Sequence, residues 1–258
     1  MDGWLSGAVA VTGAEGHVGR HVCERLAALP NDVRSGDEFA GADAAILLRG
    51  SLRPPAGGSY EHENVEPVRA AVVAARSAGV KRIVYLSYVG ADPASDNEFL
   101  RAKGRAEAAV LRGGGDAVVL RSTYIFGPRG DPGRTAEEFV AHCPGTGDQR
   151  VQPVFVRDVA DALVVAALDP RLPGGTFELC GPETFRLAEF VDVLGARDRR
   201  PPRSVAYAVS HYVHGLTPGL VGVLLRDSVA RPPLARDVLG LPRGTHLGDV
   251  WARAAAAA

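Results

Sequence analysis

Short apolar runs alternate with amphipathic stretches along most of the chain. The apolar runs predict strands at Ala8–Thr12, Asp43–Leu48, Ile83–Ser87, Ala117–Arg121, Val151–Val156 and Thr176–Leu179. Apolar residues repeated on one helical face predict helices near Val18–Ala28, Asn64–Ala78, Glu98–Leu111 and Asp158–Leu168. Because the strands are apolar throughout rather than alternating, we expect a parallel sheet covered on both faces.

The order of these elements predicts an α/β fold, a Rossmann-type doubly wound parallel sheet with a small C-terminal, mostly helical cap. We expect residues 1–150 to form the dinucleotide-binding domain and residues 151–258 to interleave the last strands with a substrate-binding cap. The stretch from Pro30 to Gly41 is short for a unit that normally takes roughly 30 residues. Only Asp32–Arg34 fits a strand there, so we expect one strand–helix pair to be missing.

Composition acts mainly by exclusion. Acidic residues number 30 and basic residues 29, so no net field attracts nucleic acid or a membrane surface. No apolar stretch is long enough to span a bilayer, and the first residues lead into a strand without the pattern of a signal peptide. Cys23, Cys143 and Cys180 lack metal-ligand spacing. We expect a cytoplasmic protein with reduced thiols, no metal and a small-molecule substrate; the oligomeric state stays open.

A glycine-rich segment, Thr12–Gly19, joins the first predicted strand to the first predicted helix. Glycines at 13, 16 and 19 permit a tight turn, close backbone approach to a diphosphate and packing of helix on sheet. The helix N-terminus then supplies free N–H groups and a positive dipole end. The pattern predicts binding of NAD or NADP. The alternative is a strand–helix turn that has lost its ligand.

The choice between NAD and NADP is open at this level. The residue that reads the adenosine ribose normally follows the second strand, which here falls in the shortened stretch. Arg20, Arg34 and Arg49 are each candidates to reach a 2′-phosphate, and none lies in a motif that decides it.

Several motifs along the chain resemble the extended and atypical short-chain dehydrogenase/reductases, which include epimerase/dehydratase-like, NmrA-like and complex I accessory-subunit-like members. They are Thr12–Gly19, Gly41–Ala44, Asn64–Glu66, Gly79–Ser87, Arg121–Pro128, Pro153–Ala160 and Gly181–Glu183. In that family the proton donor is the tyrosine of a Tyr-x-x-x-Lys pair, whose lysine lowers the tyrosine pKa and holds the ribose. This chain has Phe99 at the tyrosine position and keeps Lys103, one of only two lysines.

The resemblance implies further site residues. It favours a ribose contact for Lys103 over a solvated helix charge. Ser87 or Tyr88 takes the position of the hydroxyl that polarises the substrate, and Tyr88 is either a substitute acid or a packing residue. Expected cofactor contacts are Gly13, Gly16, His17, Val18, Gly19, Leu48, Arg49, Ser87, Lys103 and Thr123. Expected substrate contacts are Tyr88, Phe99, Tyr124, His142 and Phe155.

Two functions of different classes are consistent with these residues. The first is an NAD(P)-dependent enzyme acting on a small carbonyl or cyclic metabolite, including non-redox variants that cyclise, dehydrate or isomerise. The second is a non-catalytic NAD(P)-binding sensor or assembly module, which the missing tyrosine favours. A roomy polar pocket near Tyr88 favours the enzyme, and a site filled by aromatic side chains favours the module.

Overall fold

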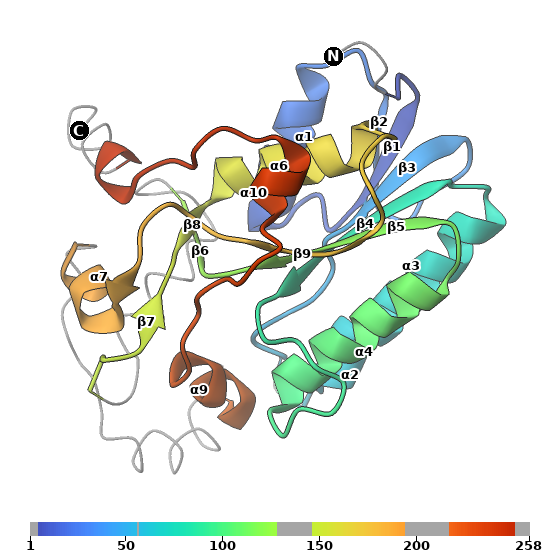
Figure 1. Cartoon of the computed structure of the whole chain (residues 1–258). Coiled ribbons are helices and arrows are strands. Elements are labelled where there is room, and N and C mark those ends of the chain that lie inside the picture. Colours follow the sequence, from blue (N-terminus) through green and yellow to red (C-terminus); the bar gives the residue numbers. More distant parts are fainter. Residues whose placement is uncertain (1–4, 56, 128–145, 194–216, 251–258) are drawn as a thin grey trace.

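The centre of the protein is a six-stranded parallel sheet with the order β2-β1-β3-β4-β5-β9. The computed structural model describes residues 5–55, 57–127, 146–193 and 217–250 (Figure 1). The sheet strands are β1 (Ala8–Thr12), β2 (Val33–Ser35), β3 (Ala42–Leu47), β4 (Arg82–Tyr88), β5 (Asp116–Ser122) and β9 (Gly175–Leu179). The expected parallel sheet is confirmed, and its first strand lies inside it between β2 and β3.

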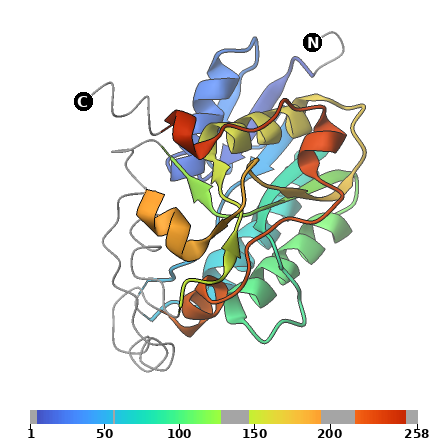
Figure 2. The same cartoon turned by 60° about the vertical axis from the view of Figure 1, so that its left-hand side comes forward.

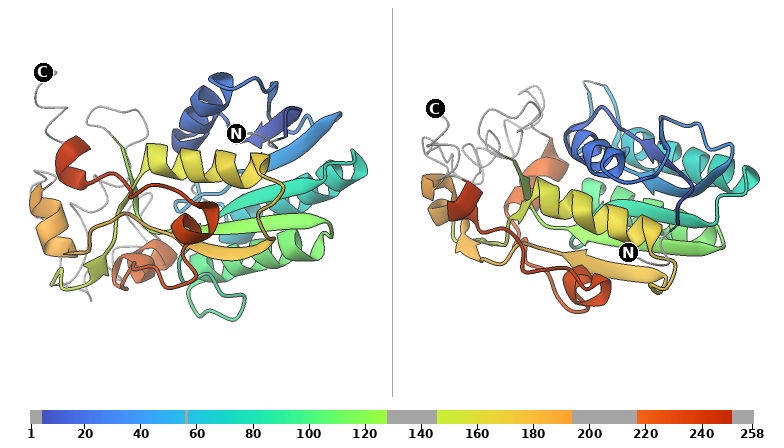
Figure 3. Two further views of the ribbon diagram at one scale, coloured as in Figure 1. Left: turned by 45° about the horizontal axis from the view of Figure 1, so that its top comes forward. Right: turned by 90° about the horizontal axis from the view of Figure 1, so that it is seen from above.

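Helices cover both faces of this sheet (Figures 1 and 3). One face carries α3 (Glu66–Ser77) and α4 (Glu98–Arg112), and the other carries α1 (His17–Ala27), α6 (Val156–Leu168) and α10 (Ala235–Leu239). Val9 and Val11 are buried towards α1 and α6, whereas Ala8 and Ala10 are buried towards α3. Burial on both faces explains why the strands are apolar at every position.

The sheet is shortened on its β2 side. The usual dinucleotide fold has the order 3-2-1-4-5-6, but here the chain passes from β2 to β3 through residues 36–41 alone. Among the described residues no strand lies outside β2, and the chain between α1 and β3 is described throughout. The missing strand–helix pair is therefore confirmed, and β2 becomes an edge strand.

Two predicted elements have different bounds in the structure. The helix expected over Asn64–Ala78 is α3, which begins at Glu66 with Pro67 in its first turn, where proline is tolerated, and a short helix that was not predicted, α2 (Tyr60–Asn64), precedes it. The strand expected over Val151–Val156 becomes β7 (Arg150–Val151) and β8 (Val154–Phe155), separated by Pro153. These pair with β10 (Phe185–Arg186) and β6 (Ile125–Phe126) in two small sheets outside the main one.

The small sheets, α7 (Leu187–Val193) and α9 (Pro218–Leu224) gather beyond one end of the main sheet (Figure 2). A separate apolar cluster holds them and includes Tyr124, Phe126, Phe155, Leu187, Phe190, Leu220 and Leu247. The C-terminal segment does not stay in this cap, because α10 returns to pack against α6 and β9. A strap at residues 225–234 links α9 to α10 and forms a bridge from Leu234 to Glu178 of β9.

Among the described helices, none has the length and hydropathy needed to cross a bilayer. Within the same ranges no group of three or more His, Cys, Asp or Glu is arranged to hold a metal ion. Cys23 and Cys180 are free thiols, and Cys143 lies outside the described residues.

Candidate functional site

The glycine loop turns tightly between β1 and α1. Gly13 has φ +70°, and its carbonyl accepts a hydrogen bond from the Gly16 N–H at 3.1 Å. A Cβ on Gly19 would lie 2.1 Å from the Gly13 oxygen and 2.7 Å from the Ala14 Cα, which no side chain tolerates. The helix therefore begins directly against the loop, and this contact requires glycine at 19.

The start of α1 is open to an anion. Gly16 is the N-cap residue and offers no side-chain acceptor to the first turn of the helix. Nearby, Thr12 Oγ1 accepts a hydrogen bond from the Leu48 N–H at 3.1 Å, which ties the end of β1 to the end of β3. Backbone N–H groups and the positive dipole end thus face the space beyond the carboxyl ends of the strands, where a diphosphate binds in this fold.

An Asp–Arg ion pair lies beside the glycine loop, on the β2 side of the sheet, where the strand–helix pair is missing. Asp37 follows β2 by two residues, and its carboxylate forms an ion pair of 3.0 Å with Arg49, which follows β3. An acid just after the second strand is the group that hydrogen-bonds the ribose 2′-hydroxyl in this fold. Sequence reasoning missed Asp37; its signal was an acid three residues after the short Asp32–Arg34 run. Arg34 itself pairs with Asp32 at 3.4 Å.

Ser87, the second-last residue of β4, has a buried hydroxyl. Only 3% of the residue is exposed, and its Oγ has no hydrogen-bond partner in the described part of the chain. A buried hydroxyl without a partner costs about 1–3 kcal/mol. A ligand group bound at the carboxyl end of β4 would remove that cost, so the residues present fit a polar cofactor here.

Lys103 of α4 is buried beside the carboxyl end of β4. It is 7% exposed, its Nζ donates to the Leu86 carbonyl at 2.9 Å, and the ammonium lies 4.5 Å from the centre of the Tyr85 ring. Burial lowers the pKa of Lys103 to about 8, while Glu107 one turn further along α4 acts in the opposite direction. Lys103 is therefore not a solvated helix charge. The ribose contact stays a prediction.

This shift of pKa predicts a pH dependence of stability. Lys103 has a folded pKa of about 8 against 10.5 for the unperturbed group. Between these values the unfolded chain holds a proton that the folded protein has released, so folding gains stability as pH rises from 8 towards 10.5. We expect the stability difference between the wild type and Lys103→Met to change in the wild type's favour over this range. Denaturant melts at pH 7, 8, 9 and 10 measure it, and a constant difference would contradict the assignment.

Aromatic side chains fill the region around the missing tyrosine. Phe99 is 5% exposed and makes edge contacts with Tyr60 and Tyr88, with ring centres 5.7 Å and 5.6 Å away. Tyr88 in turn meets Tyr124 at 6.1 Å. Phe99 is thus a packed core residue. Its apolar ring occupies the position at which the resembled dehydrogenase/reductase family has the tyrosine phenol.

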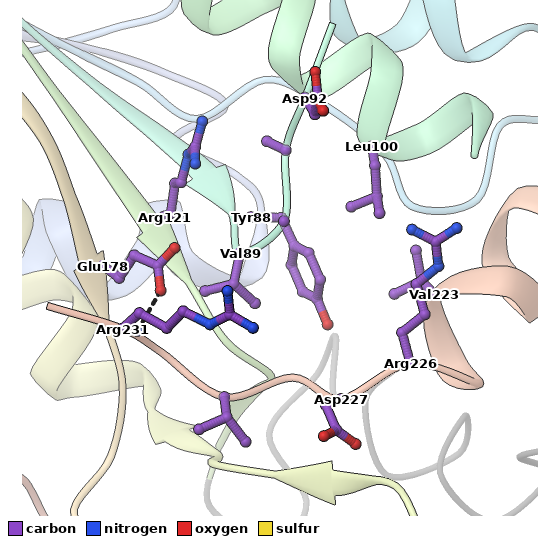
Figure 4. Close-up of a pocket in the computed structure, with 13 residues that line it drawn as sticks. Tyr88, Val89, Asp92, Leu100, Arg121, Glu178, Val223, Arg226, Asp227 and Arg231 are labelled. Carbon is purple, nitrogen blue, oxygen red and sulfur yellow. Dashed lines mark hydrogen bonds between the residues drawn. The ribbon is translucent and has the colours of Figure 1, made fainter. Parts of the chain in front are cut away.

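On its other side, Tyr88 lines a polar cavity of about 370 Å³ (Figure 4). Its hydroxyl lies 3.1 Å from Ser228 Oγ on the strap. The other lining residues are Val89, Gly90, Ala91, Asp92, Leu100, Arg121, Glu178, Val223, Arg226, Asp227, Val229 and Arg231. The volume lies within the range of small-molecule sites. Tyr88 therefore borders both the polar cavity that favours an enzyme and the aromatic cluster that favours a non-catalytic module.

The remaining predicted residues are distributed around the cleft. His17 is the first residue of α1 and stacks edge-on against His21 at 5.8 Å. Val18 packs on both the main core and the cap cluster. The Thr123 hydroxyl donates to the Gln152 carbonyl, while Phe155 packs against Phe126 inside the cap. His142 lies outside the described residues.

No protein-family model matches the chain. It is 32% identical over 174 residues to the mitochondrial NADH dehydrogenase (ubiquinone) 1 alpha subcomplex subunit 9 of Arabidopsis thaliana, covering 65% of this chain and 43% of that protein. It is 27% identical over 199 residues to the ceramide reductase of Caulobacter vibrioides, covering 64% and 62%. The chain spans about half the length of the mitochondrial relatives it matches.

Among solved structures, MoeE5 in complex with UDP-glucose and NAD superposes with a TM-score of 0.72 at 19% identity, over 95% of this chain and 96% of that one. The fold is thus a Rossmann-type α/β fold. The sequence relatives agree with the resemblance to atypical short-chain dehydrogenase/reductases that the sequence motifs carry.

Proposed function

We infer that the chain binds NAD or NADP at the glycine loop, and that nucleotide binding rather than tyrosine-dependent hydride transfer is its principal activity. The observation that carries this is the contact of Gly19 with the Gly13 carbonyl, which sets the open start of α1 at the carboxyl end of β1. Solved fold neighbours hold NAD, which supports this choice of ligand.

The residues of the chain divide the work of holding the cofactor. The α1 N–H groups would bind the pyrophosphate, and Asp37 with Arg49 would meet the adenosine ribose. By the family resemblance, Ser87 and Lys103 would lie near the nicotinamide ribose. When bound, NAD(P) supplies hydride chemistry, but Phe99 holds no proton to accompany it.

The missing strand–helix pair predicts modest cofactor affinity, because it removes contacts to the adenosine. We expect micromolar rather than nanomolar dissociation constants and a preference between NAD and NADP below roughly a hundredfold, about 2.7 kcal/mol. Isothermal titration calorimetry with both cofactors tests the proposal directly. Absence of binding by either would overturn it.

The Asp37–Arg49 pair sets the direction of that preference. The Asp37 carboxylate would accept a hydrogen bond from a ribose 2′-hydroxyl and would repel a 2′-phosphate, while its ion pair occupies the Arg49 guanidinium. Asp37→Asn removes the repulsion and releases Arg49 for a phosphate. We expect the ratio of NADP to NAD affinity to rise at least about tenfold, or 1.4 kcal/mol.

The matched control is Asp43→Asn. Asp43 also pairs with a basic residue, Lys81 at 3.6 Å, but at the opposite end of the sheet. Its change should leave both cofactor affinities within about twofold. An unchanged ratio in Asp37→Asn would show that this acid does not face the ribose.

A second candidate function is favoured by the cavity of about 370 Å³ beside Tyr88. There a small carbonyl or cyclic metabolite would meet the Tyr88 hydroxyl, in place of the phenol that Phe99 lacks. The ceramide reductase relative is consistent with such a reductase, and the mitochondrial complex subunits are consistent with a protein-bound module. A cytoplasmic location remains part of the proposal.

A further inference from the structure

The charged side chains that line the cavity beside Tyr88 differ in whether they form ion pairs. Its lining contains three arginines and three carboxylates. Two of the arginines are neutralised by acids outside the lining. Arg121 forms two hydrogen bonds to Glu107, at 2.9 Å and 2.6 Å, and Arg226 pairs with Asp96 at 2.8 Å.

Arg231 differs from these two. Its backbone N–H donates to Glu178 Oε2 at 2.5 Å, but its guanidinium makes no hydrogen bond or ion pair with the described part of the protein. Figure 4 shows this guanidinium extending from the strap towards Tyr88. A guanidinium offers five donors in a planar fork that matches a carboxylate.

Glu178 of β9 lies next to the Arg231 backbone, and its carboxylate is also directed into the cavity (Figure 4). One oxygen is used by the strap N–H, which fixes the side chain, and the other is free of hydrogen bonds to described residues. Although both side chains line the same cavity, Glu178 and the Arg231 guanidinium form no ion pair within the described ranges. A fixed anion and an unused cation therefore face the same space.

The remaining acids give this space a slight negative excess. Asp92 accepts from the Ala94 N–H and Asp227 from the Arg150 N–H, each at 2.8 Å. Figure 4 places Asp92 and Asp227 at opposite ends of the cavity. They bias the site against a ligand with two negative charges.

We propose that this cavity is a binding site for a small zwitterion, with the ligand carboxylate on Arg231 and the ligand amine on Glu178. The Tyr88 ring and the Leu100 and Val223 side chains supply apolar contact along the ligand's carbon chain. Each charge of such a ligand finds an opposite charge, whereas a diacid or a diamine leaves one end beside a like charge. This site is separate from the glycine loop and does not depend on dinucleotide binding.

Three probes with the same four-carbon chain test the charge pattern: 4-aminobutyrate, succinate and 1,4-diaminobutane. Saturation-transfer NMR and calorimetry on the full chain should show 4-aminobutyrate binding at least tenfold more tightly than either of the others, with the diamine ahead of the diacid. Saturating NADH should not displace it. No binding by 4-aminobutyrate, equal binding by succinate or the diamine, or displacement by NADH would each overturn the proposal.

Two variants assign the contacts. Arg231→Gln removes a guanidinium that no described residue uses, and Glu178→Gln keeps an acceptor for the strap N–H while removing the charge. Each variant should bind 4-aminobutyrate at least tenfold more weakly than the wild type. Arg112→Gln is the matched control, an exposed arginine at the far end of α4, and should bind like the wild type. Unchanged binding in both cavity variants would place the zwitterion elsewhere.

Discussion

Gly19→Ala should abolish dinucleotide binding, with an affinity loss of at least about a hundredfold, or 2.7 kcal/mol. The added methyl group would lie 2.1 Å from the Gly13 oxygen, so the loop and the first turn of α1 must separate. The N–H groups that face the pyrophosphate would then lose their alignment. Overpacking of this kind also costs typically 1–3 kcal/mol of folding stability. Calorimetry with NADH and thermal melts without ligand measure the two effects separately.

Two other glycines calibrate this result. A Cβ on Gly16 would lie 3.2 Å from the same Gly13 oxygen, so Gly16→Ala should show a smaller loss. A Cβ on Gly248 would enter open space, so Gly248→Ala should bind like the wild type. If folded Gly19→Ala bound NADH within threefold of the wild type, the loop would not be the anion site.

Tyr88→Phe should reduce turnover about a hundredfold if the protein is a reductase, and leave cofactor affinity nearly unchanged. Proton donation must accompany hydride transfer, and Tyr88 is the phenol that lines the cavity beside Phe99. The substitution removes one hydroxyl and its contact with Ser228 while keeping the ring. NADH oxidation with a panel of small aldehydes and ketones measures turnover, and calorimetry measures the cofactor.

Tyr60→Phe is the matched control, because the Tyr60 ring also contacts Phe99, while its hydroxyl forms hydrogen bonds with Leu52 and Thr217 instead. Its turnover should stay within about threefold of the wild type. An active enzyme indifferent to Tyr88→Phe would remove Tyr88 as the acid. A wild type that binds NADH but oxidises it with none of the carbonyls would favour the non-catalytic module.

The fold was predictable because hydrophobic burial determines it. Strands buried on both faces are apolar throughout, so β1, β3, β4 and β5 were recognisable as continuous runs. Boundaries failed where a proline acts locally. Pro67 begins a new helix after α2, and Pro153 separates β7 from β8; neither effect changes the hydrophobic period on which the predictions rested.

The parts of the candidate site that depend on backbone geometry were predictable from the sequence. The parts that depend on the direction of side chains were not. The glycine loop shows in the sequence, because only glycine fits at 19. Asp37 was overlooked because an acid in a short loop resembles any solvated residue until Arg49 is seen beside it. The burial of Lys103 and the second contact surface of Tyr88 depend on tertiary packing, which spacing alone does not reveal.

The missing outer strand also bears on how this protein avoids sticking to others. A sheet edge with unpaired backbone groups is a template for strands of other molecules, and natural proteins protect such edges with short strands and charges. The new edge, β2, has three residues, and the basic Arg34 is its central one. At the opposite edge, the strap forms a bridge to Glu178 of β9. In the described part of the chain, the edge strand β2 is therefore too short to offer a long template on which aggregation could begin.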